Sequence, residues 1–292
     1  MSANPIEKKP FFHLWPGSYA LTIGTWGCNF NCPWCQNFEI SKYAPDISKP
    51  TYLDPDRLVK MTIGMGCQGV SFSFNEPTML FEYALDVFPR ARELGLYCNY
   101  VSNGYMTEDS LNMLKEAGMD AIKFDVKGDG DAVKRYCGAD VEKVWRNIHL
   151  AKALGLHVEV VVLIIPGVND SEGCIESIVS RLLSEAGEDT PLHFTRFYPA
   201  HKAFDRQPTP IETLEKAFKI AKKLGAHYAY VGNVPGHRLE NTYCHSCGEL
   251  LVERFGFKVV IYNLDRVKSC PRCGCRIPLV GEYTHGNPRR YV

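Results

Sequence analysis

The sequence predicts an α/β protein: an open, partial barrel of six β/α units followed by a small metal-binding domain with four cysteine ligands. Two observations predict this fold class. From residue 19 to about residue 231, short β-rich runs alternate with longer stretches of helical periodicity, the pattern of β/α units around a parallel sheet. After residue 239 the character changes, and two Cys-x-x-Cys-Gly turns flank a short β-rich run. We therefore predict a partial-barrel domain over 1–239 and a metal-binding domain with its tail over 240–292.

The expected strands are rich in β-branched and aromatic residues and end at turn-forming residues. They span 19–24, 69–74, 97–102, 121–126, 157–165 and 192–197, with a weaker run at 228–232. Helical periodicity predicts helices near 54–65, 78–94, 107–117, 132–154, 170–186 and 210–224. Thr107 is typical of a helix start, and glycines close several of these helices. Six β/α units are too few to close an eight-stranded barrel, so an open barrel is expected.

Composition and charge argue against several classes of protein. The 292 residues include 33 lysines plus arginines and 33 aspartates plus glutamates, so no global field draws the chain to nucleic acid or an anionic membrane. No stretch approaches the roughly 20 apolar residues of a spanning helix, and the N-terminus lacks the apolar segment of a signal peptide. We therefore expect a cytoplasmic protein with a small-molecule or protein substrate, and neither a nucleic-acid nor a membrane partner.

Three of the twelve cysteines form the first cluster, Cys28-x-x-x-Cys32-x-x-Cys35, directly after the first expected strand. In a reducing compartment, clustered thiols more often bind metal or do chemistry than form disulfides. The loop after a strand is also where parallel α/β folds bind ligands. Three thiolates can bind three irons of a 4Fe-4S cluster and leave the fourth iron open, as in catalytic metal sites. The alternative is a structural zinc loop with a distant fourth ligand.

The CxxxCxxC loop resembles the signature of the radical S-adenosylmethionine (SAM) superfamily. The resemblance implies that Cys28, Cys32 and Cys35 hold a catalytic 4Fe-4S cluster whose open iron binds SAM, within a barrel of the radical SAM type. Trp34 occupies the position where the family commonly has an aromatic residue near the adenine. In this family the reduced cluster cleaves SAM to methionine and a 5'-deoxyadenosyl radical, which abstracts hydrogen from an unactivated carbon.

The segment Ser-Phe-Asn-Glu-Pro-Thr at 73–78 follows the second strand, where the family usually has Gly-Gly-Glu. The resemblance implies that Glu76 binds the ammonium group of SAM through charge-assisted hydrogen bonds, with Asn75 beside it. Phe74 and Asn75 stand in place of the glycines, which is a departure from the family pattern. The carboxylate itself is retained.

Two further strand ends carry similar motifs. Ser102 and Asn103 resemble part of the Thr-Asn-Gly turn of glycyl-radical-enzyme activases, and Asp125 and Lys127 resemble their Asp-x-Lys, whose members face the carboxylate and ribose of SAM. Alternation along a strand places Asp125 and Lys127 on one face. Each motif alone is consistent with a solvated strand-end charge, but their order along successive strands predicts one SAM site.

Residues after the later strands carry weaker signals. Arg196 follows the sixth strand and is predicted to contact SAM or substrate, as His201 could. Asp170 lies in a Pro-Gly-x-Asn-Asp turn that the family places near the adenine, but we predict that it caps the next helix. His193 is predicted to be a hydrogen-bonded core histidine. Cys137 is predicted to be a buried thiol, with a substrate-side thiol as the alternative.

The second cysteine cluster consists of two knuckles of the zinc-ribbon or rubredoxin kind. Cys244, Cys247, Cys270 and Cys273 offer four thiolates to one tetrahedral metal. We predict zinc; mononuclear iron and an auxiliary iron-sulfur cluster, which Cys275 could serve, are the alternatives. The β-rich run at 257–262 supplies too little core to fold unaided, so the metal is expected to be structural.

The combined motifs resemble the radical SAM enzyme of the AmmeMemoRadiSam system, which is similar to pyruvate formate-lyase activating enzymes. The resemblance covers nearly the whole chain and implies an oxidoreductase, with a glycine of a partner protein as the hydrogen donor in the activase interpretation. It also implies Memo-like and AMMECR-like partners, and an external electron donor such as a flavodoxin or ferredoxin. Two alternatives stay open: radical modification of a small molecule or peptide, and a non-catalytic iron-sulfur redox or binding module.

Overall fold

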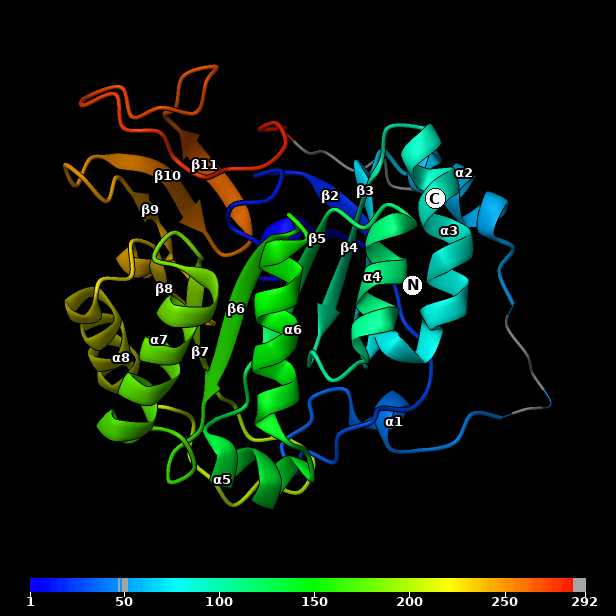
Figure 1. The fold of residues 1–292 in the computed structure, drawn as a ribbon, viewed down its shortest axis with the longest axis horizontal. Coiled ribbons are helices and arrows are strands. Elements are labelled where there is room, and N and C mark those ends of the chain that lie inside the picture. Colours follow the sequence, from blue (N-terminus) through cyan, green and yellow to red (C-terminus); the bar gives the residue numbers. More distant parts are fainter. Residues whose placement is uncertain (47, 49–51, 286–292) are drawn as a thin grey trace.

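The core of the computed structural model is one eight-stranded sheet in which each strand pairs with the next strand along the chain (Figure 1). The structure describes residues 1–46, 48 and 52–285. The strands are β1 (Ser2–Pro5), β2 (Tyr19–Ile23), β3 (Gly69–Phe72), β4 (Tyr97–Ser102), β5 (Ala121–Asp125), β6 (His157–Ile164), β7 (Leu192–Arg196) and β8 (Ala229–Gly232). β1 runs antiparallel to β2, and all later pairs are parallel. Because β1 and β8 do not pair among the described strands, the barrel is open, as predicted.

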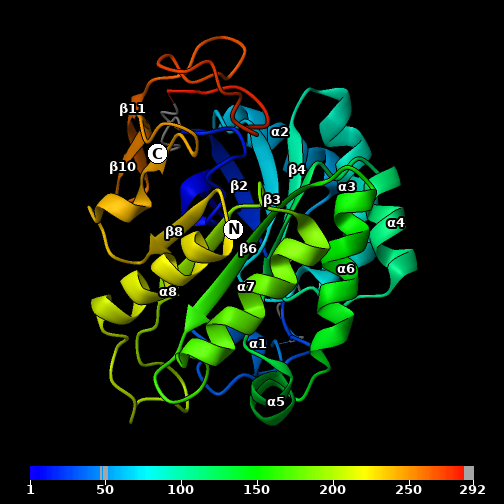
Figure 2. The ribbon, with the colours of Figure 1, turned by 60° about the vertical axis from the view of Figure 1, so that its left-hand side comes forward.

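Helices cover the outer face of the sheet, and neighbouring long helices pack against one another in chain order (Figure 2). They are α1 (Phe38–Ser41), α2 (Pro55–Gly64), α3 (Phe81–Glu93), α4 (Glu108–Glu116), α5 (Gly130–Ala132), α6 (Val141–Ala153), α7 (Glu172–Ala186) and α8 (Ile211–Leu224). Each of β2 to β7 is thus followed by helical structure before the next strand. The six predicted β/α units are confirmed, and the weaker run at 228–232 forms β8 as a seventh parallel strand.

Two predictions about helix boundaries are wrong. The single helix expected at 132–154 is interrupted, because a π-helical turn ends at Gly138, whose φ is 71°, and α6 starts again after Asp140. Asp170 does not cap α7. The cap is Ser171, whose hydroxyl accepts from the amide of Cys174 at 3.3 Å, because the helix begins one residue later than expected.

The segment between β1 and β2 closes the barrel at the amino ends of its strands. The carboxylate of Glu159 on β6 is fully buried there and accepts hydrogen bonds from the backbone amides of Phe12 and His13, at 2.9 and 2.8 Å. Its oxygens also bond the Nε2 atoms of His157 and His193, at 2.9 and 2.7 Å. His193 is therefore a hydrogen-bonded core histidine, as predicted.

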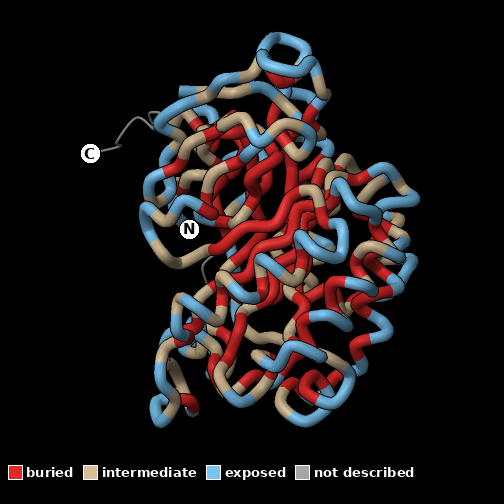
Figure 3. Tube along the Cα trace, turned by 90° about the vertical axis from the view of Figure 1, so that its left-hand side faces the viewer, coloured by how far each residue is buried: buried red, intermediate tan, exposed pale blue. Residues whose placement is uncertain are grey.

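The C-terminal part forms a separate three-stranded sheet with the order β11-β10-β9. Its strands are β9 (Thr242–Tyr243), β10 (Leu250–Phe255) and β11 (Lys258–Tyr262). Of these, only the last was expected from the sequence. This sheet lies against the amino ends of the barrel strands, on the opposite side of the molecule from α1 (Figure 1). The strands of the barrel form the buried centre, and the C-terminal loops are largely exposed (Figure 3).

No helix in the described ranges combines the length and the apolar character needed to cross a bilayer.

Candidate active site

A cavity of about 460 Å³ lies at the carboxyl ends of the parallel strands. The loop after β2, the segment after β3, the strands β4 to β7, the residue after β8 and the N-terminal segment contribute to its wall. Nine of the predicted site residues line it: Cys28, Cys32, Trp34, Cys35, Asn75, Glu76, Asn103, Asp125 and Lys127. Motifs far apart in the sequence meet in one site because neighbouring parallel strands end at the same edge of the sheet.

The loop of residues 24–37, here called the cysteine loop, is held to the end of β3 by side-chain hydrogen bonds. Asn75 accepts from the amide of Thr25 at 3.0 Å and donates to the carbonyl of Gly27 at 2.7 Å. In return, the side chain of Asn37 donates to the carbonyl of Phe74. Both ends of the amide of Asn75 are therefore used to position the loop.

The three thiols of the cysteine loop differ in environment. Cys28 and Cys35 are half-buried, whereas Cys32 is buried. Burial raises the pKa of the Cys28 thiol. The Sγ atom of Cys137 lies 3.4 Å from that of Cys32, and its hydrogen bond lowers the pKa of Cys32 to about 6. Cys137 itself is buried and lies outside the cavity wall, in agreement with a buried thiol.

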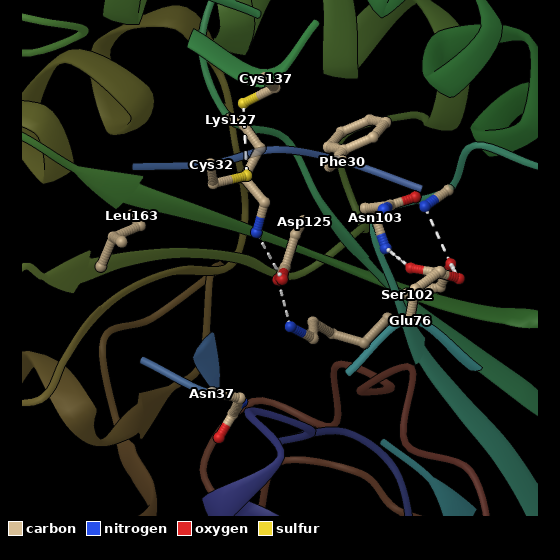
Figure 4. Close-up of polar contacts among 12 residues, drawn as sticks. Phe30, Cys32, Asn37, Glu76, Ser102, Asn103, Asp125, Lys127, Cys137 and Leu163 are labelled. Carbon is tan, nitrogen blue, oxygen red and sulfur yellow. Dashed lines mark hydrogen bonds and ion pairs between the residues drawn. The ribbon is translucent and has the colours of Figure 1, made fainter. Parts of the chain in front are cut away.

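Glu76 points its carboxylate into a set of hydrogen-bond donors between β3 and β4 (Figure 4). It accepts from the hydroxyls of Ser102 and Thr78, each at 2.7 Å, and from the amide of Asn103 at 2.8 Å. Burial raises the pKa of Glu76, and these hydrogen bonds oppose the rise. Because all of these donors are neutral groups, the carboxylate keeps the capacity to bind a cationic ligand.

Asp125 joins two lysines at the centre of the cavity wall (Figure 4). Its carboxylate bonds the Nζ of Lys127 at 2.8 Å and the Nζ of Lys123. Burial alone would raise the pKa of Asp125, but the two ammonium groups outweigh burial and hold it at about 2. Lys123 was not among the predicted site residues. Strand alternation was the available signal, since Lys123 shares the face of Asp125.

Three other candidate residues lie outside the cavity wall. Ser102 acts through the glutamate that it bonds. Arg196 donates its Nε to the carbonyl of Thr209 at 2.8 Å, which directs the guanidinium toward the loop after β7. The ring of His201 stacks on Phe38, with 5.0 Å between ring centroids.

Comparison with known proteins gives the family. Residues 22–176 match the model of the radical SAM superfamily. The chain belongs to this superfamily. An uncharacterized protein of Methanocaldococcus jannaschii is 42% identical over 281 residues, which are 96% of this chain and 84% of that protein. A second protein of that organism, named provisionally as a glycyl-radical enzyme activating enzyme, is 26% identical over 78% of this chain and 93% of its own.

The fold is also that of a solved radical SAM enzyme. The crystal structure of a radical SAM methyltransferase from Sphaerobacter thermophilus superimposes with a TM-score of 0.59 and 13% sequence identity, over 74% of this chain and 67% of that chain. This likeness shows the architecture only. It agrees with the predicted α/β partial barrel.

The radical SAM fold implies a 4Fe-4S cluster and SAM, and the thiols of the cysteine loop fit a group larger than one ion. Among the described residues, the sets of side chains whose ligand atoms all lie within 4.8 Å of one another do not include Cys28, Cys32 and Cys35. Thiolates on a single tetrahedral zinc lie about 3.8 Å apart, so these three are too widely spread for it. The indole Nε1 of Trp34 is buried without a hydrogen-bond partner in the described structure, which leaves a donor free beside the loop.

The four knuckle cysteines form a compact metal-binding set. The Sγ atoms of Cys244, Cys247, Cys270 and Cys273 all lie within 4.8 Å of one another. The pairs Cys244–Cys273 and Cys247–Cys270 are each 3.6 Å apart, close to the spacing around one tetrahedral metal. Cys275 is not a member, and its Sγ lies 3.6 Å from the Nε2 of His245 instead. A four-cysteine site that fits a metal ion is thus shown, without the identity of its metal.

Proposed function

We propose that this protein reductively cleaves SAM at a 4Fe-4S cluster held by Cys28, Cys32 and Cys35, and that it activates a glycyl-radical partner protein. The observation that carries this proposal is the placement of three spread thiols opposite Glu76 and the Asp125–Lys127 pair in one cavity. When bound, the cluster would supply the electron that breaks the bond between the sulfur and the 5' carbon of SAM, giving methionine and a 5'-deoxyadenosyl radical.

The chain's own residues would bind and orient SAM. Glu76 would accept hydrogen bonds from its ammonium group, with Asn103 and Ser102 fixing the carboxylate in place. Lys127 and Asp125 would face the carboxylate and ribose, and Trp34 would lie near the adenine. Glu76 and Trp34 are buried, which would help to exclude water from the reacting centre. To contact SAM or substrate, Arg196 would have to break its hydrogen bond to the carbonyl of Thr209.

We further assign the protein to the radical SAM enzymes of the AmmeMemoRadiSam system. The combined motifs support this assignment, and the 26% identity to the relative named as an activating enzyme supports the activase interpretation. Memo-like and AMMECR-like proteins would then be partners, and a flavodoxin or ferredoxin the electron donor, in a reducing compartment such as the cytoplasm. Direct radical modification of a small molecule or peptide is the second candidate. A non-catalytic iron-sulfur module is disfavoured because an electron carrier has no use for Glu76 and Asp125.

A cleavage assay tests the radical chemistry. We expect protein reconstituted with iron and sulfide without oxygen to form 5'-deoxyadenosine from SAM and dithionite, measured by liquid chromatography and mass spectrometry. Absence of this product from protein with a full iron complement would count decisively against the proposal. A partner protein deuterated at glycine should pass deuterium into 5'-deoxyadenosine. Deuterium arriving from a labelled small molecule instead would favour the second candidate.

We propose that residues 240–292 comprise a metal-binding domain, built around a structural zinc ion, and its tail. The knuckle cysteines support this, because Cys244 and Cys270 pack in one buried cluster with Phe12 and Tyr228 and lie outside the wall of the cavity that the cysteine loop lines. A variant with Cys28, Cys32 and Cys35 all changed to alanine should retain about one zinc ion per chain by elemental analysis. Iron above stoichiometry without zinc in that variant would refute zinc. Chelation should unfold this domain, visible as loss of protease resistance in its loops.

A further inference from the structure

The amine of Lys9 lies in the wall of the cavity without a partner of opposite charge. Lys9 follows the turn Ile6–Lys8 at the base of the barrel, and the whole residue is only 4% exposed. Within the described residues, its Nζ forms neither a hydrogen bond nor an ion pair. The Nζ makes a cation–π contact with the ring of Phe74, whose centroid lies 4.6 Å away. Its Nζ meets solvent only through the cavity, and an ammonium group enclosed to this degree is costly unless an anion accompanies it.

The surroundings of Lys9 add positive charge. Burial, Lys8 and Lys123 together lower its pKa to about 7. Of the two carboxylates in the wall, Asp125 is already bonded to both Lys123 and Lys127, and Glu76 accepts from Ser102, Thr78 and Asn103. Across the whole cavity, five lysines face two carboxylates. The inner end of the cavity therefore lacks an anion.

Phe74 is held in a strained conformation beside this amine. Its φ is 79°, in the left-handed region that a bulky aromatic residue rarely occupies. Such strain persists only where the surroundings impose it, and here the side chain of Asn37 bonds the carbonyl of Phe74. The conformation places the ring in the cavity wall against the Nζ of Lys9. A glycine at this position would offer the ammonium group no such surface.

Lys9 lies at the opposite end of the charged row from Cys32. Lys127 stands between Cys32 and Asp125 (Figure 4), whereas the cationic neighbours of Lys9 are Lys8 and Lys123. The order from Cys32 inward is therefore Lys127, Asp125, Lys123 and Lys9. An anion at Lys9 would lie beyond Lys123, on the side of that lysine away from Lys127 and Cys32.

We propose that Lys9, with Lys123 and the ring of Phe74, binds an anionic group of the substrate, a carboxylate or a phosphate, at the inner end of the cavity. This inference rests on the proposed function, because it takes the substrate to share the cavity with SAM. The carboxylate of SAM has the same chemistry and is the competing source of the anion.

Thermal unfolding of the SAM-loaded holoenzyme tests the inference with acetate and inorganic phosphate as probes and acetamide as the neutral match. Ionic strength is held constant, and each anion is added at a concentration of about ten times its dissociation constant. At least one anion should then raise the Tm by about 3 °C, and acetamide should not. Lys9→Met should remove this rise, Lys9→Arg should keep it, and Lys60→Met, an exposed lysine on α2, should behave like wild type.

Equilibrium dialysis with labelled SAM separates the two sources of the anion. The dissociation constant of SAM should change less than about twofold in Lys9→Met. A rise of about tenfold would assign Lys9 to SAM and overturn the inference, as would an equal anion effect in wild type and Lys9→Met, or none in wild type. The Tm measurement requires no SAM cleavage, so failure of the proposed function would appear separately, as absence of 5'-deoxyadenosine.

Discussion

Replacing Cys32 with alanine will reduce 5'-deoxyadenosine formation to background, whereas replacing Cys137 will not. The two thiols are both buried and only 3.4 Å apart, so they form a matched pair. Only Cys32 shares the cysteine loop with Cys28 and Cys35. Loss of one of the three proposed ligands leaves too few thiolates to hold the cluster. Cys137 is not a proposed ligand and only forms a hydrogen bond with Cys32. We expect Cys137→Ala to cost about 10- to 100-fold in cluster affinity, so that the cluster still assembles with iron and sulfide in excess.

Iron content, the visible absorption of the cluster and 5'-deoxyadenosine should be measured together for both variants. Circular dichroism will show whether each variant is folded. If Cys32→Ala retained the cluster and formed product, the proposed ligand set would be wrong. If Cys137→Ala lost the cluster as completely as Cys32→Ala, then Cys137 would have to be counted as a ligand, and the open iron would be in doubt.

Replacing Glu159 with alanine will destabilise the fold by about 3–5 kcal/mol. The substitution removes a fully buried acceptor and leaves two backbone amides and two histidines without their partner. Each orphaned buried donor costs about 1–3 kcal/mol, and partial relaxation limits the sum. For a domain of this size the Tm should fall by roughly 10 °C. The segment that holds Phe12 and His13 should also become more accessible to proteases.

Denaturant unfolding of Glu159→Ala should be compared with Glu116→Ala, an exposed residue at the end of α4, which should stay within about 0.5 kcal/mol of wild type. The pKa of Glu159 lies below its usual 4.5, because the two histidines outweigh the effect of burial. The contribution of Glu159 to the free energy of unfolding is therefore complete above about pH 4.5 and is lost only as the solution is acidified further. An equal loss of stability in both variants would contradict this role.

Much of the barrel was predictable because its signals are local. Alternating β-rich and helical periods located all seven parallel strands and most helix positions. The short strands β1, β9 and β10 were not expected, since their pairing depends on partners elsewhere in the chain. The interruption at Gly138 and the cap at Ser171 were also missed, because they depend on the conformation of one or two residues.

By itself, the sequence determined which side chains meet in the candidate site: three thiols after the first strand, and Glu76, Asp125 and Lys127 at later strand ends. Parallel strands necessarily bring their carboxyl ends together, so spacing and strand order were sufficient. The tertiary structure alone decided what surrounds these groups. Lys9 enters the cavity from a segment that no motif marks, Cys137 reaches Cys32 across the barrel, and the knuckles lie near its amino ends. These placements come from packing between distant segments, which local sequence patterns do not encode.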